Sequence, residues 1–228
     1  ITLQVAGDDY PGETQVLTLN LPGRTNGKVV LSAHLDGHDL AESAMDNATG
    51  VAVALAIARA FAPHVGDCRL GLTVCLFSAE EWALAGSRSW LERMDEAERR
   101  SIALNVNLDT IAGDDRLTGL TSEFIGLEQF VADTSAAIDI PVGVYRPMMA
   151  NSDHYNFARH GIPALRLVAG FDRPECNVRH ILSPGDTRDR VRLDELRQAA
   201  RVASALAWRA LNAQDEALAA LCNRSNTH

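Results

Sequence analysis

The stretch SAHLDGHDLAESAMDNATG, residues 32–50, holds two histidines and four acidic side chains within nineteen positions. It directly follows the apolar run KVVL, residues 28–31. Imidazole and carboxylate groups at this density after a buried strand are typical of metal ligands or of groups that transfer protons. His34, Asp36 and Asp46 are therefore the first candidates for chemistry in this chain.

Two further predicted strands end in the same kind of residue. The apolar run at 70–77 leads to Glu80 and Glu81, and the run at 102–108 leads to Asp109. In open α/β sheets the ligand crevice lies outside the carboxyl ends of the parallel strands. We therefore expect these side chains, which are far apart in the sequence, to converge on one site.

A cluster of carboxylates repels itself unless protons or a cation neutralise it. Histidine combined with carboxylate favours zinc, since magnesium and calcium prefer shells made of oxygen alone. Two zinc ions would balance the four acids Asp46, Glu80, Glu81 and Asp109. Asp46 could bridge the two ions, and His34 could complete one of them. Whether Glu80 or Glu81 faces the metal stays open on this reasoning.

The second zinc ion needs a second histidine from elsewhere in the chain. His180 lies in the long loop after the predicted strand at 163–168 and is the best placed of the seven histidines. His154 is the rival.

The elements that would position these groups alternate between strand and helix. Strands are predicted at 28–33, 70–77, 102–108 and 163–168, and helices at 48–62, 80–94, 126–138 and 193–211. The segments ITLQV and QVLTLNL are joined too closely for a crossover, so we expect them to pair antiparallel at one edge. The alternation predicts an α/β fold, a three-layer α/β/α sandwich around a mixed, mainly parallel sheet.

Length and charge limit the remaining choices. The 228 residues suit a single catalytic domain, 1–228, and a start at Ile1 suggests that it lacks an upstream segment. A net charge of −9 argues against nucleic acid as a partner. No apolar run reaches the roughly 18–20 residues of a membrane helix, so no membrane is expected as a partner either. The four cysteines are predicted to be free, buried thiols.

Six motifs carry a resemblance to a known family. They are His34-Leu35-Asp36, SAMDNATGVA, FSAEEWALAGS, NVNLDT, NSDHYNFARHGIPAL and RHILSPGDT, in this order. Residues 16 to about 190 thereby resemble the co-catalytic zinc exopeptidases, typified by secreted bacterial leucyl aminopeptidases and by plasma glutamate carboxypeptidase. The resemblance implies the zinc exopeptidase fold, a peptide or small amino-acyl substrate, and a secreted or periplasmic location.

The resemblance also assigns roles to the acidic and histidine residues. It implies that His34, Asp46 and Asp109 bind one zinc ion. It implies that Asp46, Glu81 and His180 bind the other.

The same resemblance makes Glu80 the general base and Asp36 the carboxylate that takes the second ring N–H of His34. It implies a cis peptide bond between Asp46 and Asn47.

The last motif departs from the family pattern. The family has an aromatic residue where Arg179 precedes His180, and Asp186-Thr187 comes two residues late. Arg179 could donate to the developing oxyanion, or it could be a solvated loop residue.

The segment Ser152-Asp153-His154 matches a family segment near the substrate cleft. A helix that begins there, with Ser152 as its N-cap and Asp153 in its first turn, would equally explain these two residues. Tyr155 could line a pocket for an apolar side chain, or it could pack in the core.

The predicted function is that of an aminopeptidase, in which a water shared by two zinc ions hydrolyses the N-terminal peptide bond and Glu80 moves the proton. The alternatives are a dipeptidase or carboxypeptidase of the plasma glutamate carboxypeptidase type, a glutaminyl cyclase, and a binding domain without catalysis on the same fold. A serine hydrolase is disfavoured because the sequence has no Gly-x-Ser. Oligomeric state and side-chain preference are not predicted.

Overall fold

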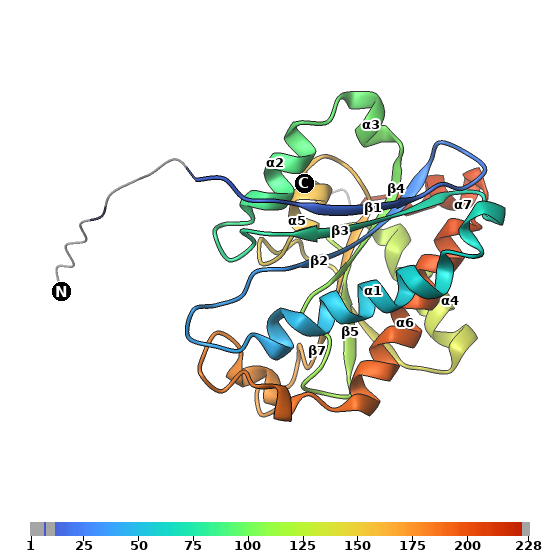
Figure 1. The fold of residues 1–228 in the computed structure, drawn as a ribbon. Coiled ribbons are helices and arrows are strands. Elements are labelled where there is room, and N and C mark those ends of the chain that lie inside the picture. The colour runs from blue at the N-terminus through green and yellow to red at the C-terminus, as the bar shows by residue number, and fades with distance from the viewer. Residues whose placement is uncertain (1–6, 8–11, 225–228) are drawn as a thin grey trace.

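The computed structural model describes residues 7 and 12–224. Its centre is a seven-stranded sheet in the order β1-β3-β2-β4-β7-β5-β6 (Figure 1). The strands are β1 Leu17–Leu21, β2 Lys28–His34, β3 Gly71–Phe77, β4 Ile102–Leu108, β5 Leu117–Leu120, β6 Val142–Tyr145 and β7 Ala164–Ala169.

Seven α-helices are described along the same part of the chain. They are α1 Thr49–Phe61, α2 Ala85–Glu92, α3 Glu96–Arg100, α4 Ile125–Ile138, α5 His154–Arg159, α6 Leu193–Leu211 and α7 Asp215–Leu221. Helices α1, α4 and α6 lie on one side of the sheet, and α2 and α5 lie on the other (Figure 1). This arrangement confirms the predicted three-layer α/β/α fold.

The parallel centre of the sheet brings the predicted site residues together. Strand β2 pairs in parallel with β3 on one side and with β4 on the other, and β4 pairs in parallel with β7. Because parallel strands end at the same edge, His34, Asp109 and the residues after Phe77 come to lie near one another.

The antiparallel part of the sheet differs from the prediction. Strand β1 pairs with β3, whereas its predicted partner, residues 1–5, lies outside the described residues. A second antiparallel pair, β5 with β7, was not predicted. Strands β5 and β6 were missed because each has only four residues and contains a glycine, which weakens the strand signal.

Helix α2 begins five residues later than predicted. Ala83 and Leu84 have φ values of 57° and 56°. This left-handed backbone cannot continue a right-handed helix. Glu80 and Glu81 consequently lie in a turn between β3 and α2, and their side chains are placed by that turn.

Helix α1 approaches the end of β4 closely. A Cβ atom at Gly50 would lie 2.3 Å from the carbonyl oxygen of Leu108. Only glycine allows this approach. The contact fixes the start of α1, and with it the preceding turn Ala44–Ala48, beside the end of β4.

The buried apolar side chains form one cluster from both sides of the sheet. On the α2 and α5 side, Phe77 packs against Trp90 and Phe157, with ring centroids 5.6 and 6.2 Å apart. Helix α6 buries Val202 and Leu206 at helical spacing, as its pattern predicts.

All four cysteines are free, as predicted, but only Cys68 and Cys75 are buried, and Cys222 is exposed. Within the described ranges, no helix combines the length and apolarity that a membrane crossing needs.

Candidate metal centre

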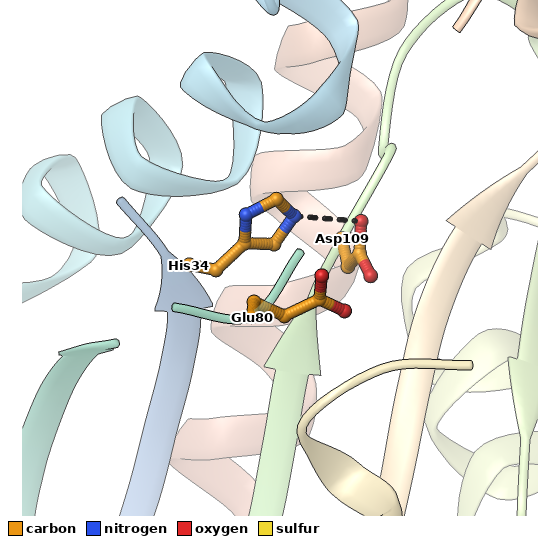
Figure 2. Close-up of side chains that lie close together, drawn as sticks. All are labelled: His34, Glu80 and Asp109. Atoms are coloured by element: carbon orange, nitrogen blue, oxygen red, sulfur yellow. Dashed lines mark ion pairs between the residues drawn. The ribbon is translucent and has the colours of Figure 1, made fainter. Parts of the chain in front are cut away.

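Three predicted residues converge at the carboxyl ends of β2, β3 and β4. One ligand atom from each of His34, Glu80 and Asp109 lies within 4.8 Å of the other two, and all three side chains are buried (Figure 2). His34 is the last residue of β2, and Asp109 directly follows β4. Three neighbouring strands thus supply one site, as the sequence predicted.

Asp46 joins this cluster from the turn Ala44–Ala48. His34 Nε2 lies 2.9 Å from Asp46 Oδ1 and 3.5 Å from Asp109 Oδ1. The peptide bond between Asp46 and Asn47 is cis, which confirms that prediction. The Asn47 side chain donates a 2.8 Å hydrogen bond to the carbonyl of Leu108 and holds the turn against β4.

Asp186 fixes the same turn from the far end of the chain. Its buried carboxylate accepts the backbone N–H of Met45 at 2.7 Å and that of Asp46 at 3.1 Å. In the sequence, Asp186 stands out only as a departure from the family spacing, because a contact across 140 residues leaves no local pattern.

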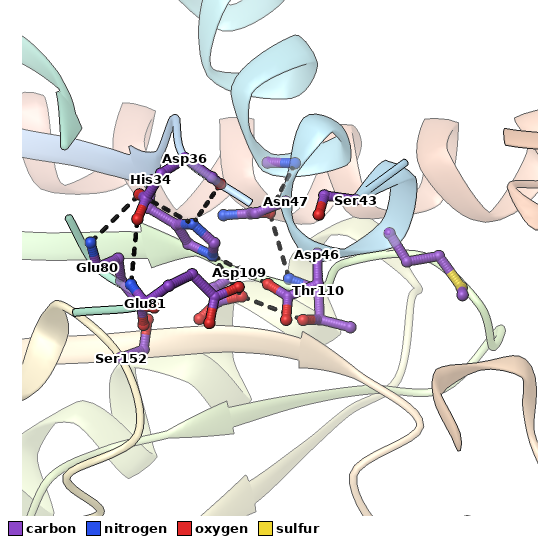
Figure 3. A network of polar contacts seen from close by, with 12 residues as sticks. His34, Asp36, Ser43, Asp46, Asn47, Glu80, Glu81, Asp109, Thr110 and Ser152 are labelled. Carbon is purple, nitrogen blue, oxygen red and sulfur yellow. Dashed lines mark hydrogen bonds and ion pairs between the residues drawn. The ribbon is translucent and has the colours of Figure 1, made fainter. Parts of the chain in front are cut away.

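Asp36 acts differently from the prediction. The closest partner of His34 Nδ1 is the backbone carbonyl of Asp36 at 3.0 Å, while the Asp36 carboxylate lies 3.6 Å away. That carboxylate accepts the backbone N–H groups of Glu80 and Glu81, each at 3.2 Å (Figure 3). Asp36 therefore orients His34 and the Glu80-Glu81 turn together.

The carbonyl partner settles the tautomer of His34. A carbonyl oxygen only accepts, so Nδ1 carries a hydrogen and Nε2 is free to bind a proton or a metal. The Nδ1–H of His34, which was predicted to bond to the Asp36 carboxylate, thus bonds mainly to the backbone carbonyl of Asp36.

The electrostatics of the cluster reflect several acids in one buried place. Burial lowers the pKa of His34, but the nearby carboxylates of Asp109, Asp36 and Asp46, which favour the protonated imidazole, outweigh it and raise that pKa well above its usual value. Burial and neighbouring acids raise the pKa of Glu80 to about 9. Burial also raises the pKa of Asp109, but the charge of Arg166 and the His34 hydrogen bond hold it well below its usual range.

These residues fit a zinc ion. His34 Nε2 faces two carboxylate oxygens, so in this structure a proton on the imidazole fills the place that a cation would take. One oxygen of Glu81, Oε1, is buried and has no hydrogen-bond partner. A buried carboxylate oxygen without a partner is costly, and a metal ion would satisfy it.

The two candidates for the second histidine ligand lie outside this close cluster. His180 is half-buried in the turn Asn177–His180, with Nε2 3.3 Å from Nε of Arg179. His154 is fully buried, neither ring nitrogen has a hydrogen-bond partner, and burial and Arg166 lower its pKa to about 3. Among the described residues, neither histidine belongs to the group within 4.8 Å.

The remaining predicted site residues divide into exposed and buried ones. The side chain of Arg179 is 53% exposed and lies 3.5 Å from Glu175. Tyr155 is half-buried, with the guanidinium of Arg159 over its ring. Asp153 is fully buried, and burial raises its pKa to about 7. The N-cap residue of α5 is Asp153 and not the predicted Ser152, and the Asp153 side chain makes no capping hydrogen bond.

A cavity of about 360 Å³ opens beside the cluster. Asp46, Glu80, Glu81 and Asp109 line one side of it. The other walls are largely apolar and include Val168, Phe171, Val178, Ile181 and Leu182. The cavity could therefore hold an apolar group next to the metal ligands.

Arg166 also lines this cavity, although it was not among the predicted site residues. Its side chain is only 9% exposed. The signal was present: an arginine stands within IPALRLV, a run predicted to be a strand buried on both faces.

A mixed sheet that gathers an imidazole and several carboxylates at the ends of its parallel strands is typical of α/β metalloenzymes. Comparison with known proteins narrows this class. The chain belongs to peptidase family M28, whose sequence model matches residues 16–207. The resemblance to the zinc exopeptidases is thereby confirmed.

The chain is similar to several aminopeptidases. It is 28% identical over 210 residues to leucine aminopeptidase 1 of Coccidioides posadasii. The alignment covers 82% of this chain and 53% of that protein. An aminopeptidase structure from an Aneurinibacillus strain is 25% identical with a TM-score of 0.74, covering 87% of this chain and 48% of the other.

A zinc aminopeptidase structure from Bacillus subtilis has a TM-score of 0.80 over 93% of this chain and 53% of its own, and at 20% identity it supports the fold alone. The chain spans about half the length of these relatives.

The role of Asp186 can be tested by stability. Asp186→Ala leaves two buried N–H groups without an acceptor, and each such loss costs about 1–3 kcal/mol. We expect the free energy of unfolding in urea to fall by roughly 2–6 kcal/mol. Asp189→Ala, at an exposed position three residues on, should change it by less than about 0.5 kcal/mol. Equal stability of the two variants would contradict the role of Asp186.

Proposed function

We propose that this chain is a zinc-dependent aminopeptidase that releases an N-terminal residue from peptides. The observation that carries the proposal is the convergence of His34, Asp46, Glu80 and Asp109 beside a largely apolar cavity. The names of the similar proteins support the same activity.

We propose two zinc ions at this centre. His34, Asp46 and Asp109 would hold one, and their closeness supports this set. Asp46, Glu81 and His180 would hold the other. The buried Glu81 oxygen without a partner supports this second set, as does the position of Val178 and Ile181, the sequence neighbours of His180, in the cavity wall.

Zinc, when bound, polarises a peptide carbonyl and makes a water more acidic. The residues of the chain do the remaining work. Glu80 lies at the edge of the cavity, where its buried carboxyl group holds a proton readily. It takes a proton from the attacking water and returns it to the leaving amine. Asp36 holds Glu80 and Glu81 in place through their backbone N–H groups.

The cavity also supports a proposal about the substrate. Its walls, Val168, Phe171, Val178, Ile181 and Leu182, would accept an apolar side chain at the N-terminal position of a peptide. The family resemblance further supports a secreted or periplasmic location.

A substrate panel tests the proposal. Leucine amide and leucyl dipeptides should be hydrolysed. Glutamyl amide should be hydrolysed at least about tenfold more slowly, because its acidic side chain would meet walls that are mainly apolar on one side and carboxylates on the other. N-acetyl-leucine amide should not be cleaved, since an aminopeptidase needs a free amine. Cleavage of N-blocked peptides with a free carboxyl end would instead indicate a carboxypeptidase. Elemental analysis of the active protein should give two zinc ions per chain.

A further inference from the structure

Arg166 lies in the middle of β7, where the neighbouring residues of the strand are fully buried. Its own side chain is 9% exposed. Burying a guanidinium group is unfavourable unless charges and hydrogen bonds compensate it, and an apolar side chain would suit the core at this position better. A role in the adjoining site would explain why an arginine is buried here.

The guanidinium group of Arg166 contacts both the carboxylate and the backbone carbonyl of Asp109. Nη2 of Arg166 lies 3.3 Å from Oδ2 of Asp109, and Nε donates to the backbone carbonyl of Asp109 at 3.4 Å. Nη1 donates a 2.8 Å hydrogen bond to the backbone carbonyl of Asn151. The planar fork thus links the end of β4 to the loop before α5.

The two oxygens of Asp109 have different surroundings as a result. Oδ2 faces Arg166, whereas Oδ1 faces Nε2 of His34 at 3.5 Å. The Thr110 hydroxyl lies 3.1 Å from the same Oδ1 and also lies 3.5 Å from Nη2 of Arg166. A carboxylate that is free to turn could offer both oxygens to a metal ion, whereas Oδ2 of Asp109 is already in contact with Arg166.

We propose that Arg166 is a positioning residue of the metal centre, which holds Oδ2 of Asp109 so that Oδ1 alone is offered to the zinc ion beside His34. The proposal rests on the proposed zinc site. It assigns Arg166 no contact with substrate. Arg166 acts through Asp109, in the way that the hydrogen-bonding partner of a metal ligand fixes the orientation of that ligand.

Arg166→Gln tests this role, with Arg166→Lys as a second variant that keeps the charge but loses the fork. Arg209→Gln is the matched control, because Arg209 is an arginine of α6 held by Asp133 and Thr134 away from the site. The zinc affinity of each purified protein is measured by competition with a chromophoric chelator. Each protein is then loaded with cobalt in place of zinc, and its visible spectrum is recorded.

We expect both Arg166 variants to bind zinc about 10–100-fold more weakly than the unmodified protein, and Arg209→Gln to match it. Their cobalt spectra should have lower absorptivity, because release of Oδ2 raises the coordination number. Arg166→Lys keeps the positive charge but loses the planar fork, so it separates the effect of orienting Asp109 from the effect of charge. It also provides the test if Arg166→Gln does not fold.

Unchanged affinity and spectrum in a folded variant would overturn the proposal. So would tighter zinc binding by Arg166→Gln, which would indicate that the cation merely repels the metal. Absence of zinc and cobalt uptake by the unmodified protein would instead contradict the proposed metal site itself.

Discussion

Glu80→Gln is expected to lower kcat for leucine amide by about 10²–10⁴-fold while leaving zinc content unchanged. Glutamine has nearly the same shape as glutamate but cannot accept the proton of the attacking water. It also retains the backbone N–H that Asp36 holds, so the turn after β3 should keep its conformation. The measurement combines steady-state kinetics with elemental analysis of the same sample.

Glu92→Gln supplies the control, because Glu92 is exposed at the end of α2 and undergoes the same chemical change outside the site. Its kinetics should match those of the unmodified protein. If the Glu80 variant kept its activity, Glu80 would not be the base. If it lost zinc instead, Glu80 rather than Glu81 would be a ligand, an assignment that the closeness of Glu80 to His34 and Asp109 makes worth testing.

Removal of metal is expected to change how stability depends on pH. The pKa of His34 is raised in the folded protein, so its stabilisation is complete below the unfolded value of 6.5 and is lost as pH rises through the folded pKa. The pKa of Glu80 is raised from 4.5 to about 9, so its contribution has the same sign and is lost towards pH 9. The Tm of the metal-free protein should therefore fall between pH 6.5 and 9.

Zinc should reverse this trend, because it binds the deprotonated ligands and replaces the proton on His34. With free zinc held at a fixed concentration, 100 times its dissociation constant at pH 6.5, the gain in stability at that pH is about 2.7 kcal/mol, or roughly 5–10 °C in Tm for a chain of this size. The gap between loaded and metal-free protein should widen from pH 6.5 to 8.

Scanning calorimetry of chelator-treated and reloaded samples measures both curves. His160→Gln, which changes the exposed histidine at the C-terminal end of α5, should leave the gap unchanged. A gap that does not depend on pH would contradict the view that a proton on His34 takes the place of the metal.

The sequence by itself predicted the fold class and the core of the site. Strand and helix periodicity are local signals, and the carboxyl ends of parallel strands must share one edge of the sheet. His34, Glu80 and Asp109 could therefore be placed together without a structure. Asp46 could be included as well, because it follows the same strand as His34 after a short loop. Only its cis peptide bond came from the family resemblance, which rests on the order of short motifs.

The sequence could not identify the residues whose role depends on long-range contacts. The contact of Asp186 with Asp46 spans 140 residues, and that of Arg166 with the Asp109 carbonyl spans 57. Neither contact leaves a periodic pattern. The short strands β5 and β6 were missed for a related reason, since their pairing within the sheet, more than their composition, makes them strands.

The tertiary structure alone decided which atoms meet at the site. Asp36 was predicted correctly as a partner of His34, but packing of the turn after β3 directs its carboxylate to the N–H groups of Glu80 and Glu81 and leaves its carbonyl to the imidazole. The sequence determined which side chains are available at the edge of the sheet. Which oxygen of each faces the metal position depends on neighbours that only folding brings near, such as Arg166 behind Asp109.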